Sequence, residues 1–433
     1  VMYYIVETEE QLNRLYCLGD ECYIKIIPMN DEYHSALTSP CLIYFKTFKG
    51  KGYVFPINHS EAFRLDFNKV IEWIESKYEK IYTTNKKECL YFFDSPKLID
   101  IPYDNNNLDY TPIRSRTYDK YGHLPFCTSL VPISKIYEQE EKNFKEIREK
   151  IPTEINDFYN DTFPKVFKSI EEQGLRIHHD YFNKHFKYHE KEWFIHGETV
   201  YTKYNLYNLT TRPTNSFNGV NFAALNKNDG SRTAFIPKND MFFEFDYDAY
   251  HVRILANLIG FKLDKESVHN QLGKMYFNKE ELTDDEYSKS KELTFKQLYG
   301  GVFKEYKEIP FFKAMNEYVE KLWELFNATE KLELVGGKIL TKEQIQNPTP
   351  NKVLNYMIQS AETHNNVISV RKVIDYLDNK QSKVILYTYD SFLVDYSSID
   401  GKEVLKEIKK LLENKKYVVK VAYGNNYNSL KDI

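Results

Sequence analysis

The sequence has few cysteines for its length, five among 433 residues. All five lie in the first third of the chain, and none belongs to a CxxC pair: they are Cys17, Cys22, Cys41, Cys89 and Cys127. This odd, unpaired set argues against a disulfide framework and against a cysteine-based zinc site. A reducing cytoplasm is therefore the expected location.

Long apolar runs and a strong charge of one sign are also missing. No run approaches the roughly 18 apolar residues of a membrane span, and the start, VMYYIVETEEQL, lacks the basic and apolar regions of a signal peptide. Secretion and membrane insertion are therefore not expected. The formal net charge of −4 gives no general attraction to nucleic acid, so any such binding would need a locally basic cleft.

What is present predicts several subdomains with an ample core, since 42% of the residues are hydrophobic. Residues 1–105 alternate short β-rich runs with one helical stretch, NKVIEWIESKYEKIY, as in a small α/β domain. A polar, irregular segment typical of a linker follows. Residues 133–173 predict charged, solvated helices rather than a core. Strands up to Phe245, helices from Tyr250 to about residue 326 and a final mixed portion predict an α+β fold.

The stretch MFFEFDYDAYHVRILANLIG, Met241 to Gly260, places a carboxylate where a buried strand ends. MFFEF predicts a buried strand and VRILANLIG an amphipathic helix packed on a sheet. Asp246, between them, is therefore poorly solvated and needs a partner. For a lone aspartate, the ordinary interpretation is that this partner is an arginine or a helix N-terminus.

A second stretch, ILYTYDSFLVDY, Ile385 to Tyr396, predicts a hairpin whose turn presents Asp390 and Ser391. Taken alone, these are ordinary turn residues. Together with Asp246, however, Asp390 would give two carboxylates from distant strands. Such a pair suits two Mg²⁺ ions about 4 Å apart, which activate an attacking hydroxyl and stabilise the leaving oxygen in phosphoryl transfer.

A third stretch, EYSKSKELTFKQLYGG, predicts a helix with Lys291, Phe295 and Tyr299 on one face. That face offers one ammonium group for phosphates and two rings on which a base could stack. The alternative is an amphipathic helix that buries the two rings beside a lysine whose charged end reaches water.

These three stretches resemble motifs A, B and C of the family A DNA polymerases, the group of bacterial polymerase I and the short phage polymerases. Three further segments resemble that family in the same order: LTTRPTNSFNGVNFAALN with SRTAFIP, SVHNQLGKMYF, and LNYMIQSAE. The resemblance spans Arg212 to Tyr396. It implies a right-hand polymerase with an N-terminal exonuclease-like α/β domain (1–105), a linker and reduced thumb (106–195), a palm (196–260 and 351–433) and fingers (261–350).

The resemblance also implies roles for individual residues. Asp246 and Asp390 would ligate two Mg²⁺ ions, which Mn²⁺ could replace, with the backbone carbonyl of Tyr247 as a further ligand. The incoming dNTP would contact the side chains of His251, His269, Lys291, Phe295 and Tyr299. Primer-template DNA would contact those of Arg212, Asn355, Gln359 and Tyr389. Without the resemblance, we would interpret Asn355 and Gln359 as part of a solvated helix face. We would interpret His269 as a structural histidine.

The chain departs from the family pattern at several positions. His251 stands where the family usually has the glutamate that excludes ribonucleotides, although an imidazole is also bulky enough to block a 2′ hydroxyl. Tyr389, Asp390 and Ser391 stand where motif C usually reads HDE, which removes one accessory carboxylate. At the start of motif B, Tyr287 replaces the usual arginine and leaves one fewer triphosphate cation unless Lys289 compensates. Asp248 is an extra acid, expected to be solvated.

The N-terminal domain lacks the DxE motif of a proofreading exonuclease, because Asn30, Asp31 and Glu32 lie in a predicted loop. We therefore expect an inactive exonuclease-like domain. The predicted activity is template-directed addition of dNTPs to a primer 3′ hydroxyl. We expect a monomeric polymerase of phage or viral type that acts in the host cytoplasm. A processivity factor is also expected, although no residue identifies it. The alternatives are an inactive nucleic-acid-binding module, a 3′ exonuclease with a vestigial polymerase part, and a polymerase that accepts ribonucleotides.

Overall fold

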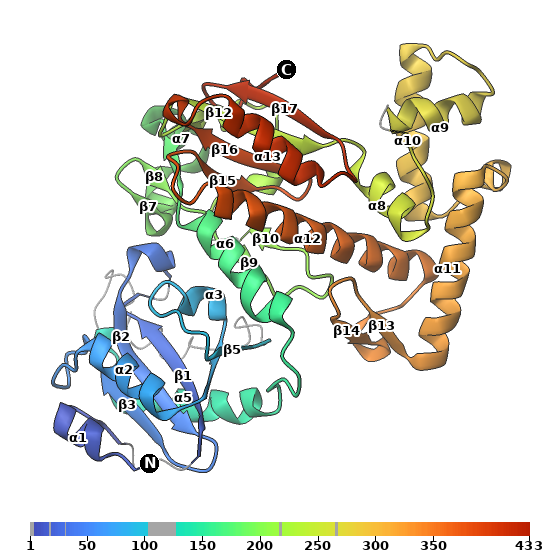
Figure 1. Ribbon diagram of the computed structural model, residues 1–433. Coiled ribbons are helices and arrows are strands. Elements are labelled where there is room, and N and C mark those ends of the chain that lie inside the picture. Colours follow the sequence, from blue (N-terminus) through green and yellow to red (C-terminus); the bar gives the residue numbers. More distant parts are fainter. Residues whose placement is uncertain (1–3, 17–18, 31, 103–126, 216–218, 265–266) are drawn as a thin grey trace. The chain divides into compact units, whose positions relative to one another are not determined.

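The computed structural model describes residues 4–16, 19–30, 32–102, 127–215, 219–264 and 267–433 (Figure 1). Cys17, Asp31 and most of the predicted linker lie outside these ranges. The chain divides into two compact units. The first comprises Val1–Glu172 with Phe186–Lys203, and the second Gln173–His185 with Tyr204–Ile433. The subdomain boundaries predicted from the sequence stay a prediction.

The first unit is built on a five-stranded sheet with the order β3-β2-β1-β4-β5. Its strands are β1 (Glu21–Pro28), β2 (Pro40–Thr47), β3 (Gly52–Pro56), β4 (Lys80–Thr84) and β5 (Leu98–Ile101). The first three pair antiparallel, whereas β4 pairs parallel with β1 and β5. The helices of this unit are α1 (Glu9–Arg14), α2 (Phe67–Lys77), α3 (Lys86–Cys89), α5 (Ile133–Arg148) and α6 (Phe163–Glu171), and two short strands are β7 (Ile195–His196) and β8 (Thr199–Val200).

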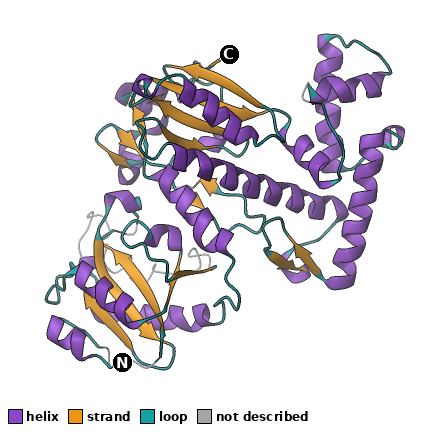
Figure 2. Cartoon of the chain, viewed as in Figure 1, coloured by secondary structure: helices purple, strands orange, loops and turns teal. Residues whose placement is uncertain are grey.

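Helices cover both faces of this sheet, because its strands are apolar on both sides (Figure 2). Ile24 and Phe45 pack with α2 on one face, whereas Tyr23 and Tyr44 pack with α5 on the other. The prediction of solvated helices was therefore wrong for α5, and it was also wrong for α6, which buries Phe163, Val166, Phe167 and Ile170. Between its many charged residues, α5 carries apolar residues at helical spacing, and these pack on the second face of the sheet. They are Ile133, Ile136, Tyr137, Phe144 and Ile147. The described cysteines of this unit, Cys22, Cys41, Cys89 and Cys127, are free thiols.

The second unit contains an antiparallel sheet with the order β15-β16-β12-β17-β18. Its strands are β12 (Met241–Tyr247), β15 (Lys383–Tyr387), β16 (Ser391–Tyr396), β17 (Val419–Gly424) and β18 (Lys431–Asp432). The predicted strand before Asp246 and the predicted hairpin around Asp390 are confirmed as β12 and β15–β16. The strand β12 lies between β16 and β17, and its Phe242 and Phe245, which point to opposite faces of the sheet, are both completely buried.

Helices make up most of the remainder of the second unit (Figure 1). They are α7 (His179–Phe186), α8 (Tyr250–Leu258), α9 (Val268–Phe277), α10 (Asp284–Gly300), α11 (Pro310–Thr329), α12 (Pro350–Tyr376) and α13 (Glu403–Glu413). Short strands are β6 (Leu175–Ile177), β9 (Tyr204–Asn205), β10 (Thr214–Asn215), β11 (Phe235–Ile236), β13 (Lys331–Glu333) and β14 (Ile339–Thr341). The helix α12 packs against α11 and the β13–β14 hairpin through Phe326, Leu332, Leu340 and Val353. In the described ranges no helix is both long and apolar enough to cross a membrane.

Candidate active site

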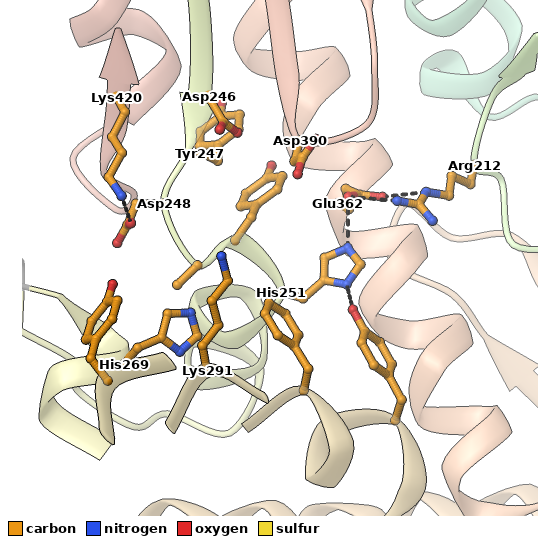
Figure 3. A pocket seen from close by; sticks show the side chains of 15 residues that line it. Arg212, Asp246, Tyr247, Asp248, His251, His269, Lys291, Glu362, Asp390 and Lys420 are labelled. Carbon is orange, nitrogen blue, oxygen red and sulfur yellow. Dashed lines mark hydrogen bonds and ion pairs between the residues drawn. The ribbon is translucent and has the colours of Figure 1, made fainter. Parts of the chain in front are cut away.

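The sheet of the second unit brings Asp246 and Asp390 together where the adjacent strands β12 and β16 meet the pocket (Figure 3). Asp246 on β12 pairs in register with Ser391 on β16, so the turn residue Asp390 lies next to the end of β12. The Tyr247 N–H donates a hydrogen bond of 2.9 Å to the Asp390 carbonyl oxygen. Both aspartates line one pocket of about 310 Å³. Two carboxylates 144 positions apart in sequence thus face the same cavity.

The two aspartates ionise less readily than ordinary carboxyl groups. Burial, and then the charges of Asp390 and Glu244, raise the pKa of Asp246 to about 7. Desolvation within the pocket, helped by the charge of Glu362, also raises the pKa of Asp390. Like charges held close together in a partly desolvated site favour protonation or a bound cation. The pair is therefore an electrostatically suitable place for a divalent ion.

A buried asparagine, Asn366 of α12, holds the turns on both sides of the pocket floor. Its Nδ2 donates to the carbonyl oxygen of Tyr389 at 2.6 Å, and its Oδ1 accepts from the hydroxyl of Tyr250 at 2.6 Å. Tyr389 needs such support because its φ of 68° is unfavourable for a residue with a side chain. The sequence interpretation missed Asn366. Its one available signal is the helical spacing that places it on the same face as Asn355, Gln359 and Glu362.

The helix α10 forms the wall opposite the aspartates. Lys291, Phe295 and Tyr299 all line the pocket, as the predicted helix face requires. The rings of Phe295 and Tyr299 are nearly parallel, with centroids 6.3 Å apart. Lys291 is exposed to the pocket and forms no ion pair with any described residue. This wall therefore offers one uncompensated ammonium group beside two aromatic rings.

His269, from α9, adds a neutral imidazole to the same wall. It is 5% exposed and lines the pocket, and burial, followed by the charge of Lys291, lowers its pKa to about 4. Its Nδ1 is buried and has no hydrogen-bond partner within the described part of the chain. A buried polar atom without a partner is costly. Its position at the pocket therefore favours a ligand that supplies the missing hydrogen bond.

His251 belongs to a network centred on Glu362, which sequence reasoning missed. Glu362 is completely buried; its Oε1 is 2.8 Å from His251 Nε2, and its Oε2 is 3.0 Å from Arg212 Nε. Because a carboxylate only accepts, Nε2 carries the proton toward Glu362. His251 Nδ1 is 2.5 Å from the Tyr299 hydroxyl. The ring of His251 is thus fixed between α12 and α10.

Asp248 was predicted to be solvated, and this prediction was wrong. Its Oδ1 lies 2.6 Å from Lys420 Nζ, and its Oδ2 lies 3.4 Å from Arg253 Nη2. Burial opposes ionisation, but these two cations lower the pKa of Asp248. The cause is strand pairing, since β17 runs beside β12 and pairs Lys420 with Asp246. No local pattern in the sequence predicts that register.

The remaining predicted residues lie outside or at the margin of the pocket. Arg212 lines it and stacks over the ring of Tyr389, with its guanidinium carbon 3.8 Å from the ring centroid. Asn355, Gln359 and Tyr389 are not among its lining residues. Tyr287 lines the pocket at the position where a cation was expected, and Lys289 does not. The DNA-contacting roles of these residues stay predictions.

Comparisons with known proteins give matches in structure but not in sequence. No protein-family model matches the chain, and no curated protein matches it in sequence. Among solved structures, the chain is similar to the POL domain of Pol1 from M. smegmatis in complex with DNA primer-template and dNTP. The TM-score is 0.65 at 11% identity, over 95% of this chain and 97% of that one. A likeness at this low identity shows the fold alone. The chain therefore has the fold of a DNA polymerase domain, as the order of its motifs predicted.

Proposed function

We propose that the chain is a template-directed DNA polymerase of family A that adds dNTPs to a primer 3′ hydroxyl and releases pyrophosphate. The observation that carries the proposal is the meeting of Asp246 and Asp390 in one pocket, opposite Lys291 and His269. An acidic floor facing a cationic and aromatic wall suits a metal-bound nucleoside triphosphate. The similar solved structure, which holds DNA primer-template and dNTP, supports the same reading.

The donor set at the pocket floor fits two Mg²⁺ ions, or Mn²⁺ in their place. Asp246 and Asp390 supply hard carboxylate oxygens, and the backbone carbonyl of Tyr247 is a further oxygen ligand. The raised pKa of Asp246 supports this fit, because a bound cation would relieve the crowding of like charges. The described residues offer no cluster of three or more His, Cys, Asp or Glu side chains able to hold a metal, so water and phosphate oxygens would complete the coordination. Such ions, when bound, activate the attacking hydroxyl and stabilise charge on the leaving group.

The side chains of the pocket would position the nucleotide. Lys291 would bind phosphate oxygens, and neutral His269 would donate a hydrogen bond from its buried nitrogen. Phe295 and Tyr299 would pack against the sugar and base. His251, held by Glu362, would lie next to the sugar and restrict a 2′ hydroxyl.

Binding of primer-template DNA would depend on contacts to its backbone and minor groove. Arg212, Asn355, Gln359 and Tyr389 would lie near the primer terminus, where minor-groove acceptors shared by all base pairs allow recognition without sequence preference. Because the net charge is −4, affinity should come from local phosphate contacts and fall steeply with salt. We propose that the chain acts as a monomer with a processivity factor.

The N-terminal unit would be an exonuclease-like domain without proofreading activity. Its central strand β1 carries Lys25, whose Nζ donates to Thr84 Oγ1 at 3.2 Å, and the neighbouring β2 carries Lys46, which pairs with Glu141 at 2.7 Å. A two-metal nuclease needs paired carboxylates rather than ammonium groups on its central strands. This arrangement supports a role as a scaffold or a guide for DNA.

Extension of a labelled primer on a DNA template tests the proposal. The parent should extend the primer with Mg²⁺ and dNTPs, whereas Asp390→Asn should be slower by about a thousandfold or more, since metal binding contributes several kcal/mol to the barrier. Asp432→Asn, at an exposed acid of the same sheet, is the matched control. Failure of the parent to extend with either metal would overturn the proposal in favour of a binding module. Lanes with NTPs test His251, and primer shortening without nucleotides would contradict the inactive exonuclease domain.

A further inference from the structure

Lys420 gives the pocket a cation that no motif of the sequence indicated. It lies on β17 directly beside Asp246 of β12 and lines the pocket. In Figure 3, Lys420 extends from a strand above the pocket and Lys291 from a helix below it. The strand β17 and the helix α10 thus each contribute one lysine to the same cavity.

Asp248 would keep a second cationic partner if Lys420 moved away. The carboxylate is 13% exposed and contacts Arg253, which is itself 5% exposed. Arg253 additionally donates to the backbone oxygens of Asp248 and Asp264, so it is fixed in place. Lys420, by contrast, is 61% exposed, and an ion pair with so exposed a partner contributes little stability. Lys420 is therefore the more exposed of the two cations and the one that can turn toward a ligand while Arg253 stays on Asp248.

The surroundings of Lys420 are suited to an anion. His269 presents a buried Nδ1 that lacks a hydrogen-bond partner in the described ranges. Tyr287 lines the same pocket as Lys420, at the position where the motif resemblance had implied a triphosphate-binding arginine. Two divalent ions on two carboxylates would retain a net charge of about plus two, less than a triphosphate needs for neutralisation. Lys291 and Lys420 supply the difference.

We propose that Lys420 binds the polyphosphate chain of the ligand, exchanging its contact with Asp248 for a phosphate oxygen, opposite Lys291 and His269. The proposal rests on the proposed function and adds to it a phosphate-binding residue from the palm. The incoming triphosphate and the pyrophosphate product share the chemistry that Lys420 would recognise.

Calorimetric titration with Mg²⁺ tests this site without any catalytic readout. Tripolyphosphate, pyrophosphate and a dNTP, each without DNA, are titrated into the parent and into Lys420→Gln. Loss of a charged contact to phosphate should weaken binding about tenfold. Equal weakening for all three ligands would place Lys420 on the chain common to them, and weakening only for tripolyphosphate and dNTP would place it on the part that pyrophosphate lacks. Unchanged binding of all three ligands by Lys420→Gln, or no binding by the parent, would overturn the proposal.

Three control variants separate this role from a structural one. Lys431→Gln removes the same charge from the neighbouring β18 and should bind as the parent does. Lys420→Arg should retain most of the affinity, because it keeps the charge. Asp248→Asn should bind at least as tightly as the parent, since Lys420 loses its resting partner; weaker binding would overturn the exchange.

The outcome can be distinguished from that of the proposed function. If the parent extends primers but Lys420→Gln binds polyphosphate normally, the role of Lys420 is wrong and the polymerase proposal stands. If no variant extends primers but polyphosphate binding depends on Lys420, the polymerase proposal is wrong and the anion site stands.

Discussion

Replacing Asp246 with asparagine should stabilise the chain in the absence of metal while removing its polymerase activity. The pKa of Asp246 rises from an ordinary value of 3.8 to about 7 on folding, through burial and then through the charges of Asp390 and Glu244. The folded state therefore binds this proton more tightly than the unfolded state. Stability from this group is complete below about pH 4, falls as the pH rises toward 7, and is absent at pH 8.

The size of the effect follows from the same pKa. A rise from 3.8 to about 7 corresponds to at most about 4 kcal/mol of destabilisation at pH 8. Solvent in the open pocket screens part of the repulsion, so we expect about 1 to 2 kcal/mol. For a unit of this size, that corresponds to an increase of roughly 2 to 8 °C in the midpoint of unfolding.

Scanning calorimetry of the parent and Asp246→Asn measures this directly, and it resolves separate transitions if the two units unfold independently. In EDTA at pH 8 the variant should unfold at the higher temperature, and the difference should shrink as the pH is lowered toward 4. Added Mg²⁺ should stabilise the parent more than the variant. An equal or lower midpoint for the variant in EDTA at pH 8 would refute the reasoning.

Asp248→Asn is a matched control of opposite sign. Burial opposes ionisation of Asp248, but Lys420 and Arg253 more than offset it and lower the pKa of this carboxyl. Its ionised form therefore stabilises the fold above the ordinary pKa, and that stability is lost as the pH falls. Removal of this charge should lower the midpoint at pH 8, so a general effect of Asp-to-Asn replacement cannot explain a rise at Asp246.

Three further substitutions test the contacts around the pocket. Glu362→Gln should destabilise the fold by about 2 kcal/mol and slow primer extension, because a buried carboxylate that orients His251 loses its charge; unchanged unfolding and extension would contradict this. Asn366→Ala should cost about 2 to 3 kcal/mol in denaturant unfolding, because the carbonyl of Tyr389 loses a buried donor; a loss well below 1 kcal/mol would show that water replaces it. Ala249→Gly should raise stability by about 1 kcal/mol, since φ is 47° there, and thermal unfolding without a rise would argue against strain.

Local patterns in the sequence predicted the elements that carry the chemistry. The apolar run before Asp246, the hairpin around Asp390 and the spacing of Lys291 with Phe295 each depend on residues within about ten positions. Their joint meaning came from the order of the motifs, because each stretch alone has an ordinary structural explanation. The similarity of the fold to a polymerase domain agrees with that order.

Residues that act across elements could not be predicted in this way. Lys420 reaches the site through the pairing of β17 with β12, and Glu362 through packing of α12 beside α8. Strand register and helix packing are set by tertiary contacts that no short window of sequence contains. The same limit explains the wrong prediction for α5. Its many charges favoured a solvated helix, and only the structure shows the sheet face that buries its apolar residues.

The backbone turns beside the two aspartates place a further condition on the site. Ala249, at the start of α8, and Tyr389, before Asp390, both have positive φ, a conformation that surrounding contacts must maintain in residues with side chains. Asn366 supports the Tyr389 turn directly, since it donates to the carbonyl oxygen of Tyr389, and it ties this turn to the start of α8, since it accepts from the hydroxyl of Tyr250. The separation of the two carboxylates therefore depends on one buried amide of α12 as well as on the pairing of β12 with β16. A substitution far in sequence from either motif can thus change how the chain holds metal ions while both aspartates remain in place.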